Sequence, residues 1–122
     1  MHNYPNQIEK NLEFDQIRNL IKGYCQMSVS RAMVESESFS VDFGEIRQRL
    51  MQISDYIKII EVESNYPKGN MEDIEPLLIK IKLKGSYLGS NDFLILNKGN
   101  RILSQWQQFL HKNKESYVCL LY

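Results

Sequence analysis

Apolar residues recur with the period of an α-helix through the middle of the chain, from Asp42 to Glu61. Their intervals are three or four residues, so on a helix they form one stripe about five turns long. The stripe consists of Phe43, Ile46, Leu50, Ile53, Ile57 and Ile60. Asp42 and Glu45 have the spacing of a reciprocal N-cap, and Ser40 is an alternative cap. We expect the stripe to pack inside a helical bundle, although its near-heptad spacing also fits a short coiled-coil seam.

Two shorter helices are expected before this one. The first is Phe14–Tyr24, and Gly23 lies where it helps to end the helix. One face of this helix carries Phe14, Ile17, Leu20, Ile21 and Tyr24. The second helix is capped by Ser28 or Ser30 and reaches Glu37. Its inward residues are expected to be Val29, Ala32 and Met33.

Local signals conflict in the stretch that begins at Pro76. Pro76 in a first turn and Gly85 just past an end favour a helix. Apolar residues that alternate with lysines over Leu78–Lys84 favour a strand, so helix and strand stay open for that segment. Our prediction is a short helix from Pro76 to about Lys82, followed by one extended stretch over Leu83–Leu88.

A last long helix is expected from Asn91 to about Lys112, with Ser90 as its cap. Gly99 interrupts its inner face, which we expect to be a point where another helix crosses closely. The inner face carries Phe93, Leu96, Leu103, Trp106 and Leu110, with Ile102 and Phe109 beside it. A polar loop, Val62–Asn70, precedes this half of the chain.

The two ends of the chain differ from the helical middle. Residues 1–11 are polar and predict a mobile arm, whereas residues 12–112 hold the expected helices. The final segment, SYVCLLY, is apolar, which is unusual for a chain terminus. We therefore expect residues 1–122 to form a single helical domain. We also expect it to be the amino-terminal fragment of a longer protein, with 113–122 as the start of a truncated element.

Composition is ordinary for a globular protein, with 122 residues of which 43% are hydrophobic and 25% are charged. No apolar run approaches the roughly 18 residues of a membrane span, and no signal peptide is recognisable. We expect a cytoplasmic protein with no membrane partner. Cys25 and Cys119 are too far apart for a disulfide framework, and His2 and His111 lack metal-site spacing. Reduced thiols and no metal site are the expectation.

Charge is distributed unevenly along the chain, although the formal net charge is zero. Residues 1–75 contain 8 Lys/Arg and 13 Asp/Glu, whereas residues 76–114 contain 7 Lys/Arg and only Asp92. This asymmetry favours an anionic partner for the second half, unless the two halves simply face each other or solvent. The candidate nucleic-acid contacts are Lys80, Lys82, Lys84, Lys98 and Arg101. They would contact phosphates, or else form a solvated edge that discourages aggregation.

Sequence motifs of catalysis are missing. The chain has neither G-x-x-x-x-G-K-[ST] nor G-x-G-x-x-G, and no histidine has the neighbours of a catalytic triad. Carboxylate pairs such as Glu35/Glu37 lie where solvated charge is expected. We expect no catalytic, cofactor-binding or metal-binding residue in this chain, and no enzyme activity from it alone.

Four segments, in this order, resemble the amino terminus of one protein family. They are LEFDQIRNLIKGYC (Leu12–Cys25), SVSRAMVES (Ser28–Ser36), FSVDFGEI (Phe39–Ile46) and IEPLLIKIKLKGSYL (Ile74–Leu88). They are similar to the second bacterial type of MutS protein, ATPases that carry a carboxy-terminal Smr nuclease domain. The chain departs from that pattern at Gly44, where the family usually has a charged residue. It departs again at Lys82 and Lys84, where an acidic residue often precedes the glycine. The resemblance spans about Tyr4 to Tyr122.

The resemblance implies an all-α helical bundle segment from the MutS core and lever region, which links a DNA-embracing clamp to the ATPase. It implies that ATP, Mg²⁺ and the nuclease belong to domains downstream of Tyr122, and that no catalytic residue of the family lies in this chain. For the full-length protein it implies a homodimer, with branched or mismatched DNA or the ribosome as partner. It also favours helix over strand for Pro76–Lys82.

Three functional hypotheses follow from these patterns. The leading one is a non-catalytic scaffold segment of a MutS-like DNA repair and recombination-control ATPase. The second is a small nucleic-acid-binding helical module that uses its basic second half. The third is a stand-alone helical adaptor that dimerises through the Phe43–Ile60 stripe.

Overall fold

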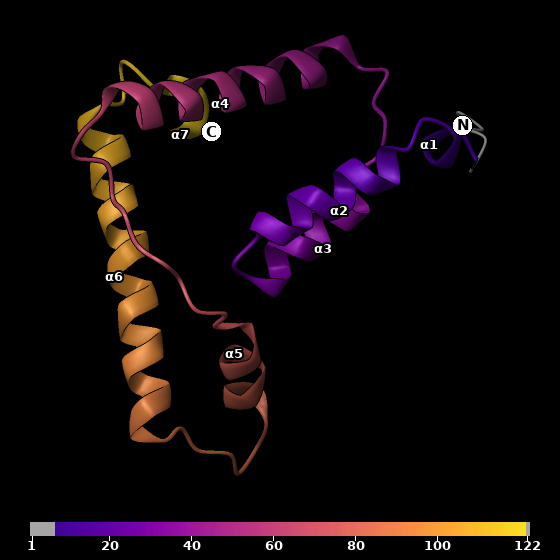
Figure 1. Cartoon of the computed structure of the whole chain (residues 1–122). Coiled ribbons are helices and arrows are strands. Elements are labelled where there is room, and N and C mark those ends of the chain that lie inside the picture. Colours follow the sequence, from indigo (N-terminus) through magenta and orange to yellow (C-terminus); the bar gives the residue numbers. More distant parts are fainter. Residues whose placement is uncertain (1–6, 122) are drawn as a thin grey trace. The chain divides into compact units, whose positions relative to one another are not determined.

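The computed structural model describes residues 7–121, which contain helices and no strand. The helices are α1 (Ile8–Asn11), α2 (Phe14–Tyr24), α3 (Ser28–Ser36), α4 (Phe43–Val62), α5 (Glu75–Lys82), α6 (Ser90–Lys112) and α7 (Val118–Leu121). The all-α prediction is therefore confirmed for the described part of the chain (Figure 1). The chain divides into two compact units, Met1–Glu37 and Ser38–Tyr122, called here the amino-terminal and carboxy-terminal units. That residues 1–122 form one domain stays a prediction.

The amino-terminal unit contains α1, α2 and α3, and α1 falls in the stretch that was predicted to be a mobile arm. Ile8–Asn11 are helical, the first six residues of that stretch lie outside the described part, and the mobility of the arm stays a prediction. The backbone N–H of Leu12 donates to the carbonyl of Ile8 at 2.9 Å and extends the turn. Glu13 then adopts a left-handed conformation, with φ of 56°, and separates α1 from α2.

Arg18 is the residue around which this unit is built. Its side chain lies between α1, α2 and the end of α3, and the residue is only 8% exposed. Nη2 donates to both carboxylate oxygens of Glu9, at 2.9 and 3.1 Å. Nη1 donates to backbone carbonyls at the end of α3, those of Val34, Glu35 and Glu37. These carbonyls have no donor inside the helix, so the guanidinium caps α3 and its charge is favourably placed at a helix carboxy terminus.

The apolar residues of this unit are mostly exposed. The predicted inward positions of α3 are wrong, because Val29 is 44% and Met33 is 66% exposed, and Ala32 is exposed as well. On α2, Leu20 is 67% exposed. On α2 the physical reason is that Arg18 is turned toward α3, and the middle of the apolar face lies about 100° from Arg18 around the helix.

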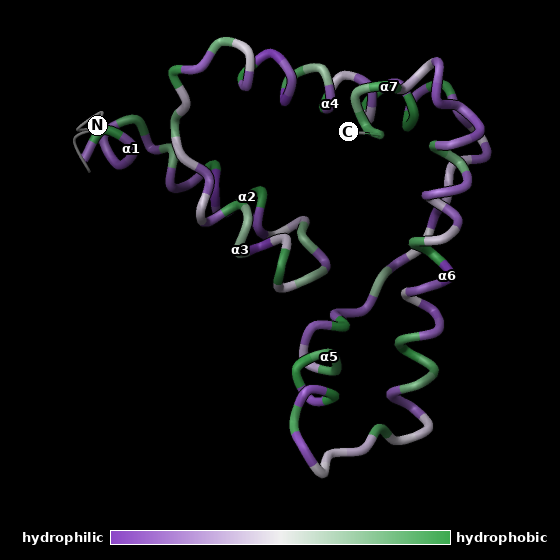
Figure 2. The backbone as a smooth tube through the Cα atoms, turned by 180° about the vertical axis from the view of Figure 1, so that it is seen from behind, coloured by the Kyte–Doolittle hydropathy of each residue, from purple (hydrophilic) through white to green (hydrophobic). Residues whose placement is uncertain are grey.

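The carboxy-terminal unit has its core where the ends of α4 and α6 meet α7 (Figure 1). Three side chains form the Ile59 cluster: Ile59 at 0% exposure, Tyr117 at 5% and Phe109 at 7%. Aromatic rings continue the cluster, with Trp106 centred 5.9 Å from both Tyr56 and Phe109. Away from this corner, hydrophobic positions are spread along α5 and α6 (Figure 2). The buried core is therefore small and local.

The beginning of α4 agrees with the prediction. Asp42 Oδ1 accepts from the backbone N–H groups of Gly44 and Glu45, at 2.8 and 3.1 Å. The alternative cap, Ser40, contributes as well, since its hydroxyl donates to Glu45 Oε2 at 2.7 Å and accepts from the Asp42 N–H at 3.2 Å. Both predicted capping residues thus act together at one helix end.

The apolar stripe of α4 does not form the core, so the expectation that it packs inward is wrong for this structure. All six stripe residues are exposed, from 37% at Ile46 to 76% at Phe43. The buried residues of α4 are Asp55 and Ile59. At 100° per residue, Ile59 points roughly 150° away from the middle of the stripe. The core side is fixed by long-range bonds instead, from Gln52 Nε2 to the Cys119 carbonyl (3.2 Å) and from the Tyr117 hydroxyl to Glu63 (2.9 Å).

Residues Glu75–Lys82 form α5, and Pro76 lies in its first turn. The segment that was left open between helix and strand is therefore helical as far as Lys82. Within the predicted extended stretch, Leu83 is extended and lies in a bend, Lys84 and Gly85 form a turn, and residues 86–88 form neither helix nor strand. Gly85 has a φ of 80°, which favours glycine, and the Ser86 N–H donates to the Leu83 carbonyl at 3.1 Å. The Ser86 hydroxyl also donates to the carbonyls of Lys80 and Leu83, so it closes the end of α5.

The N-cap of α6 is Gly89 rather than Ser90, because the Asp92 carboxylate accepts from the Gly89 N–H at 3.0 Å. Gly99 is buried where a close crossing was expected. The crossing segment is the connection between α4 and α5, not a helix: a Cβ at Gly99 would lie 3.3 Å from Met71 and 3.4 Å from Ile74. Two predicted inner residues, Phe93 and Leu103, are 60% and 53% exposed, because only one side of α6 meets that connection.

Candidate nucleic-acid interface

The five predicted contact residues fall into three different situations. Lys80 is half-buried, and its Nζ lies 3.0 Å from Asp92 Oδ2 and 5.9 Å from the centre of the Tyr87 ring. The hydrogen bond from Lys80, followed by that from the Gly89 N–H, holds the pKa of Asp92 below its usual value. Lys80 therefore ties α5 to the start of α6, which makes it a structural residue.

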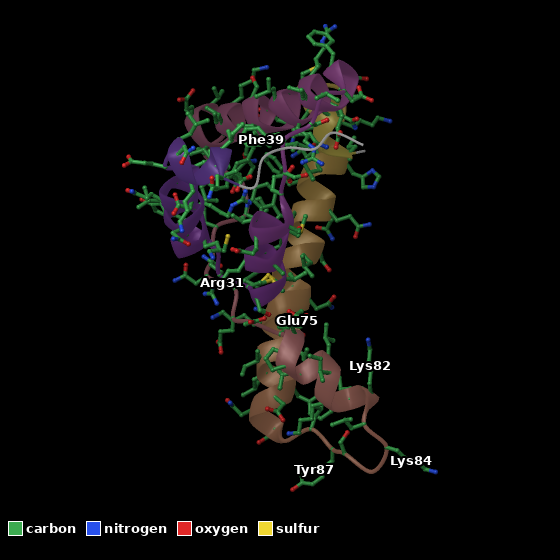
Figure 3. The ribbon with its side chains drawn as sticks, turned by 90° about the vertical axis from the view of Figure 1, so that its right-hand side faces the viewer. Arg31, Phe39, Glu75, Lys82, Lys84 and Tyr87 are labelled. Atoms are coloured by element: carbon green, nitrogen blue, oxygen red, sulfur yellow. The ribbon has the colours of Figure 1, made fainter. Side chains whose placement is uncertain are left out.

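Lys82 and Lys84 lie at the turn between α5 and α6, and Figure 3 shows them projecting outward with Tyr87 nearby. Tyr87 is 82% exposed. Within residues 7–121, no carboxylate forms an ion pair with either lysine. Because α5 extends to Lys82, Lys80 and Lys82 both lie on a helix, where their side chains point about 160° apart.

Lys98 and Arg101 lie one turn apart on α6, away from the α5–α6 turn. Lys98 Nζ is 3.6 Å from Glu72 Oε1, and both side chains are about half exposed, so the pair is loose. Arg101 is exposed. The basic series is thus split between the α5–α6 turn and one face of α6.

A groove that the sequence analysis missed lies beside the carboxy-terminal half of α6. It has a volume of about 440 Å³ and is lined by Asn65, Pro67, Lys68, Gln105, Gln108, Phe109 and Lys112. Lys68 also lies over the Tyr66 ring, at 4.9 Å from its centre. The loop residues come within reach of α6 only through folding. The periodic spacing of Gln105, Gln108 and Lys112 after Arg101 was the available signal in the sequence.

The titratable groups with shifted pKa values each have a structural partner. Burial raises the pKa of Tyr117, and the hydrogen bond to Glu63 adds to it. The Lys22 ammonium, bonded at 2.6 Å, lowers the pKa of Glu35. Across residues 7–121, no three or more His, Cys, Asp or Glu side chains gather as a metal site. In the same range, every helix is too short or too polar to cross a membrane.

Comparison with known proteins gives two low-identity similarities. Endonuclease MutS2 of Fusobacterium nucleatum subsp. nucleatum is 24% identical over 86 residues, which cover 70% of this chain and 11% of that protein. Endonuclease MutS2 of Ligilactobacillus salivarius is 21% identical over 103 residues, which cover 84% of this chain and 13% of that protein. The chain is similar to a segment of MutS2. It spans only about an eighth of the length of these MutS2 relatives. No family model and no solved structure matches it.

The MutS2 similarity agrees with the family resemblance of the four sequence segments in one respect: both relate this chain to a segment of a MutS2 protein. Its alignments cover 70% and 84% of this chain. They do not assign a role to Lys80, Lys82, Lys84, Lys98 or Arg101, so phosphate contact by these residues stays a prediction.

Proposed function

We propose that the chain is the non-catalytic amino-terminal core and lever segment of a MutS-like DNA repair and recombination-control ATPase. The observation that carries this proposal is the similarity to MutS2 over 70% to 84% of the chain. In this role the segment is a cytoplasmic scaffold between the clamp, which engages branched or mismatched DNA or the ribosome, and the ATPase. In the full-length homodimer, ATP and Mg²⁺ bind a domain downstream of this segment. The nuclease substrate also binds downstream of this segment.

The geometry of α4 supports a scaffold role. One side of this helix packs on α6 and α7 through Ile59, while the opposite side presents the Phe43–Ile60 stripe to its surroundings. A helix with two apolar sides can connect two bodies, because each side buries against a different partner. In the proposed full-length protein, the stripe is where a further part of the MutS-like core packs.

The coding sequence downstream of Tyr122 tests this proposal directly. We expect an open reading frame that contains G-x-x-x-x-G-K-[ST], since that motif holds the nucleotide phosphates. A native stop codon after Tyr122 with no such motif would contradict it. In the full-length protein, Leu50→Asp is expected to lower DNA-dependent ATP hydrolysis, whereas Arg47→Gln, at an exposed residue of the same helix outside the stripe, serves as the control.

A second candidate is a stand-alone adaptor that dimerises through the same stripe, and its support is the exposure of all six stripe residues. Sedimentation of the 122-residue chain tests it. A dimer that Ile53→Asp abolishes would favour the adaptor. A monomer at high concentration would exclude it. A third candidate is the nucleic-acid-binding module, supported by the exposed cations of the second half, Lys82, Lys84 and Arg101.

A further inference from the structure

One face of α6 carries a regular row of polar residues without any carboxylate. They are Lys98, Arg101, Gln105, Gln108 and Lys112, at intervals of three, four, three and four residues. All five are exposed. We call them the α6 ladder. No acidic residue occurs on α6 after Asp92, so the ladder carries three formal positive charges along one helical face.

The remainder of the fold holds this face outward. Gly99 lies against Met71 and Ile74, Ile102 lies against Gly69, and Phe109 is buried in the Ile59 cluster. Around the helix, Gly99 lies about 145° from the middle of the ladder, Ile102 about 85° and Phe109 about 65°, so packing on that side of α6 leaves the ladder residues exposed. The ladder is therefore presented by a helix whose rotation is fixed by packing.

Two residues of the connecting loop join the ladder at its carboxy-terminal end. Asn65 and Lys68 line the 440 Å³ groove together with Gln105, Gln108 and Lys112, over the edge of Phe109. The groove thus combines two ammonium groups with three carboxamides, and no carboxylate lines it. Ammonium groups attract an anion, and carboxamides both donate and accept hydrogen bonds.

The length of the ladder matches a polymer better than a single anion. From Lys98 to Lys112 the helix rises about 21 Å, at about 1.5 Å per residue. A nucleic-acid strand advances about 3.4 Å per phosphate, so about six phosphates span this distance. The cations lie at both ends and the glutamines lie between them, where their amides can pair with base edges.

We propose that the α6 ladder and its groove bind a nucleic-acid strand through its phosphodiester backbone. This inference deepens the nucleic-acid-binding candidate and rests on it, but it moves the contact from the α5–α6 turn to α6. Lys98, Arg101, Lys112 and Lys68 contact phosphates, and Gln105 and Gln108 contact phosphates or base edges. Glu72, 3.6 Å from Lys98, competes with the phosphates and is displaced on binding.

Two matched double variants of the 122-residue chain test this proposal. Arg101→Gln/Lys112→Gln neutralises the ladder, and Lys82→Gln/Lys84→Gln neutralises the turn. Each pair removes two exposed charges, so both change the net charge equally. Binding is measured by fluorescence anisotropy against duplex DNA, single-stranded DNA and RNA, which distinguish the sources of the phosphodiester. Polyglutamate serves as an anion without phosphates, and circular dichroism checks that each variant is folded.

We expect the ladder variant to lose affinity by on the order of tenfold per removed contact at about 0.1 M salt, because each contact releases condensed counterions. For this variant, the slope of log affinity against log salt concentration should become shallower, by about 1.8 on duplex DNA and about 1.4 on single strands. The turn variant should lose less than about threefold through screened long-range attraction. Gln105→Ala/Gln108→Ala should weaken binding without changing the salt slope.

Each contrary result has a distinct meaning. Equal losses in the two double variants, or a larger loss in the turn variant, would overturn the α6 ladder while leaving nucleic-acid binding by the chain in place. Salt-independent or absent binding by the unmodified chain would overturn both. Polyglutamate binding as tight as nucleic-acid binding would assign the ladder to an acidic protein surface.

Discussion

The amino-terminal unit is organised by a buried guanidinium, whereas the carboxy-terminal unit is organised by an aliphatic side chain that clusters with two aromatic rings. Arg18 joins a carboxylate from α1 to carbonyls at the end of α3. Ile59 joins α4 to Phe109 of α6 and to Tyr117 just before α7. Both arrangements bring together three helical segments with very few buried residues.

The two arrangements differ in whether their contacts have a required direction. Five hydrogen bonds fix the position and direction of Arg18, and loss of the guanidinium leaves their acceptors without a donor. The contacts of the Ile59 cluster have no required direction. Their stabilising free energy depends on the apolar surface area removed from water, at roughly 25 cal/mol per Å². The charged arrangement specifies which face of α2 turns inward, even though the apolar face is the larger one.

The largest effect is expected from Phe109→Ala in the carboxy-terminal unit. Truncation of this buried ring should cost about 3 to 5 kcal/mol of unfolding free energy, since it contacts both Trp106 and Tyr117. Hydrogen exchange should show lost protection in α4, α6 and α7 and unchanged protection in α2. Phe93→Ala is the matched control on the same helix, because Phe93 is 60% exposed. Equal losses from the two variants would contradict the assigned core.

The converse variant is Arg18→Met, which keeps the length of the side chain and removes its charge and donors. We expect a loss of about 3 kcal/mol confined to the amino-terminal unit, since a partly buried carboxylate and the α3 carbonyls lose their partner. Arg31→Met is the control, because Arg31 is exposed and donates to the single carbonyl of Cys25. Hydrogen exchange in α2 and α3 is the readout. A loss of protection in α6 instead would show that the two units unfold together.

Local rules predicted some helix ends correctly, although the N-caps of α3 and α6 are Met27 and Gly89 and not the predicted serines. Asp42 caps α4, Pro76 lies in the first turn of α5, and Gly85 takes a positive φ just beyond it. Each depends on residues within about four positions, so the sequence carries the information locally. The all-α class follows from the same periodicity.

Helix rotation was not predictable from periodicity. The stripe of α4 is the stronger apolar pattern, yet the inward side is set by Gln52 bonded to Cys119 and Glu63 bonded to Tyr117, partners that lie 67 and 54 positions away. Burial of Arg18 likewise depends on carbonyls 16 to 19 positions away. For the candidate site, the sequence identified individual cations such as Lys98 and Arg101. It did not place Lys68 with them, because Lys68 reaches the α6 groove only through the path of the loop after α4.

A smaller effect is expected from Tyr117→Phe, and it depends on pH. Burial, followed by the Glu63 hydrogen bond, raises the pKa of Tyr117 above the ordinary value of 10.0. A raised pKa in the folded state means that the contribution is complete below about pH 10 and is lost as pH rises through the folded pKa. The unmodified carboxy-terminal unit should therefore weaken with increasing pH from about 10 upward, whereas Tyr117→Phe should lack this part of the alkaline loss. Thermal unfolding from about pH 8 to about pH 11 measures it. Tyr87→Phe, at an 82% exposed residue, should follow the unmodified profile.

The smallest effect is expected from Glu35→Gln, which asks whether the amino-terminal unit depends on charge beyond Arg18. Lys22 Nζ lies 2.6 Å from Glu35 Oε2, and this hydrogen bond, followed by the Lys22 charge, lowers the pKa of Glu35 below 4.5. A lowered pKa means that the contribution is present above about pH 4.5 and is lost as pH falls through the folded pKa. The unmodified unit should lose more stability on acidification than Glu35→Gln, by a small amount because the Glu35 side chain is 62% exposed. Acid titration of the thermal midpoint measures the difference, with Glu61→Gln on α4 as the control. Identical acid profiles for all three proteins would leave Arg18 as the one charge on which this unit measurably depends.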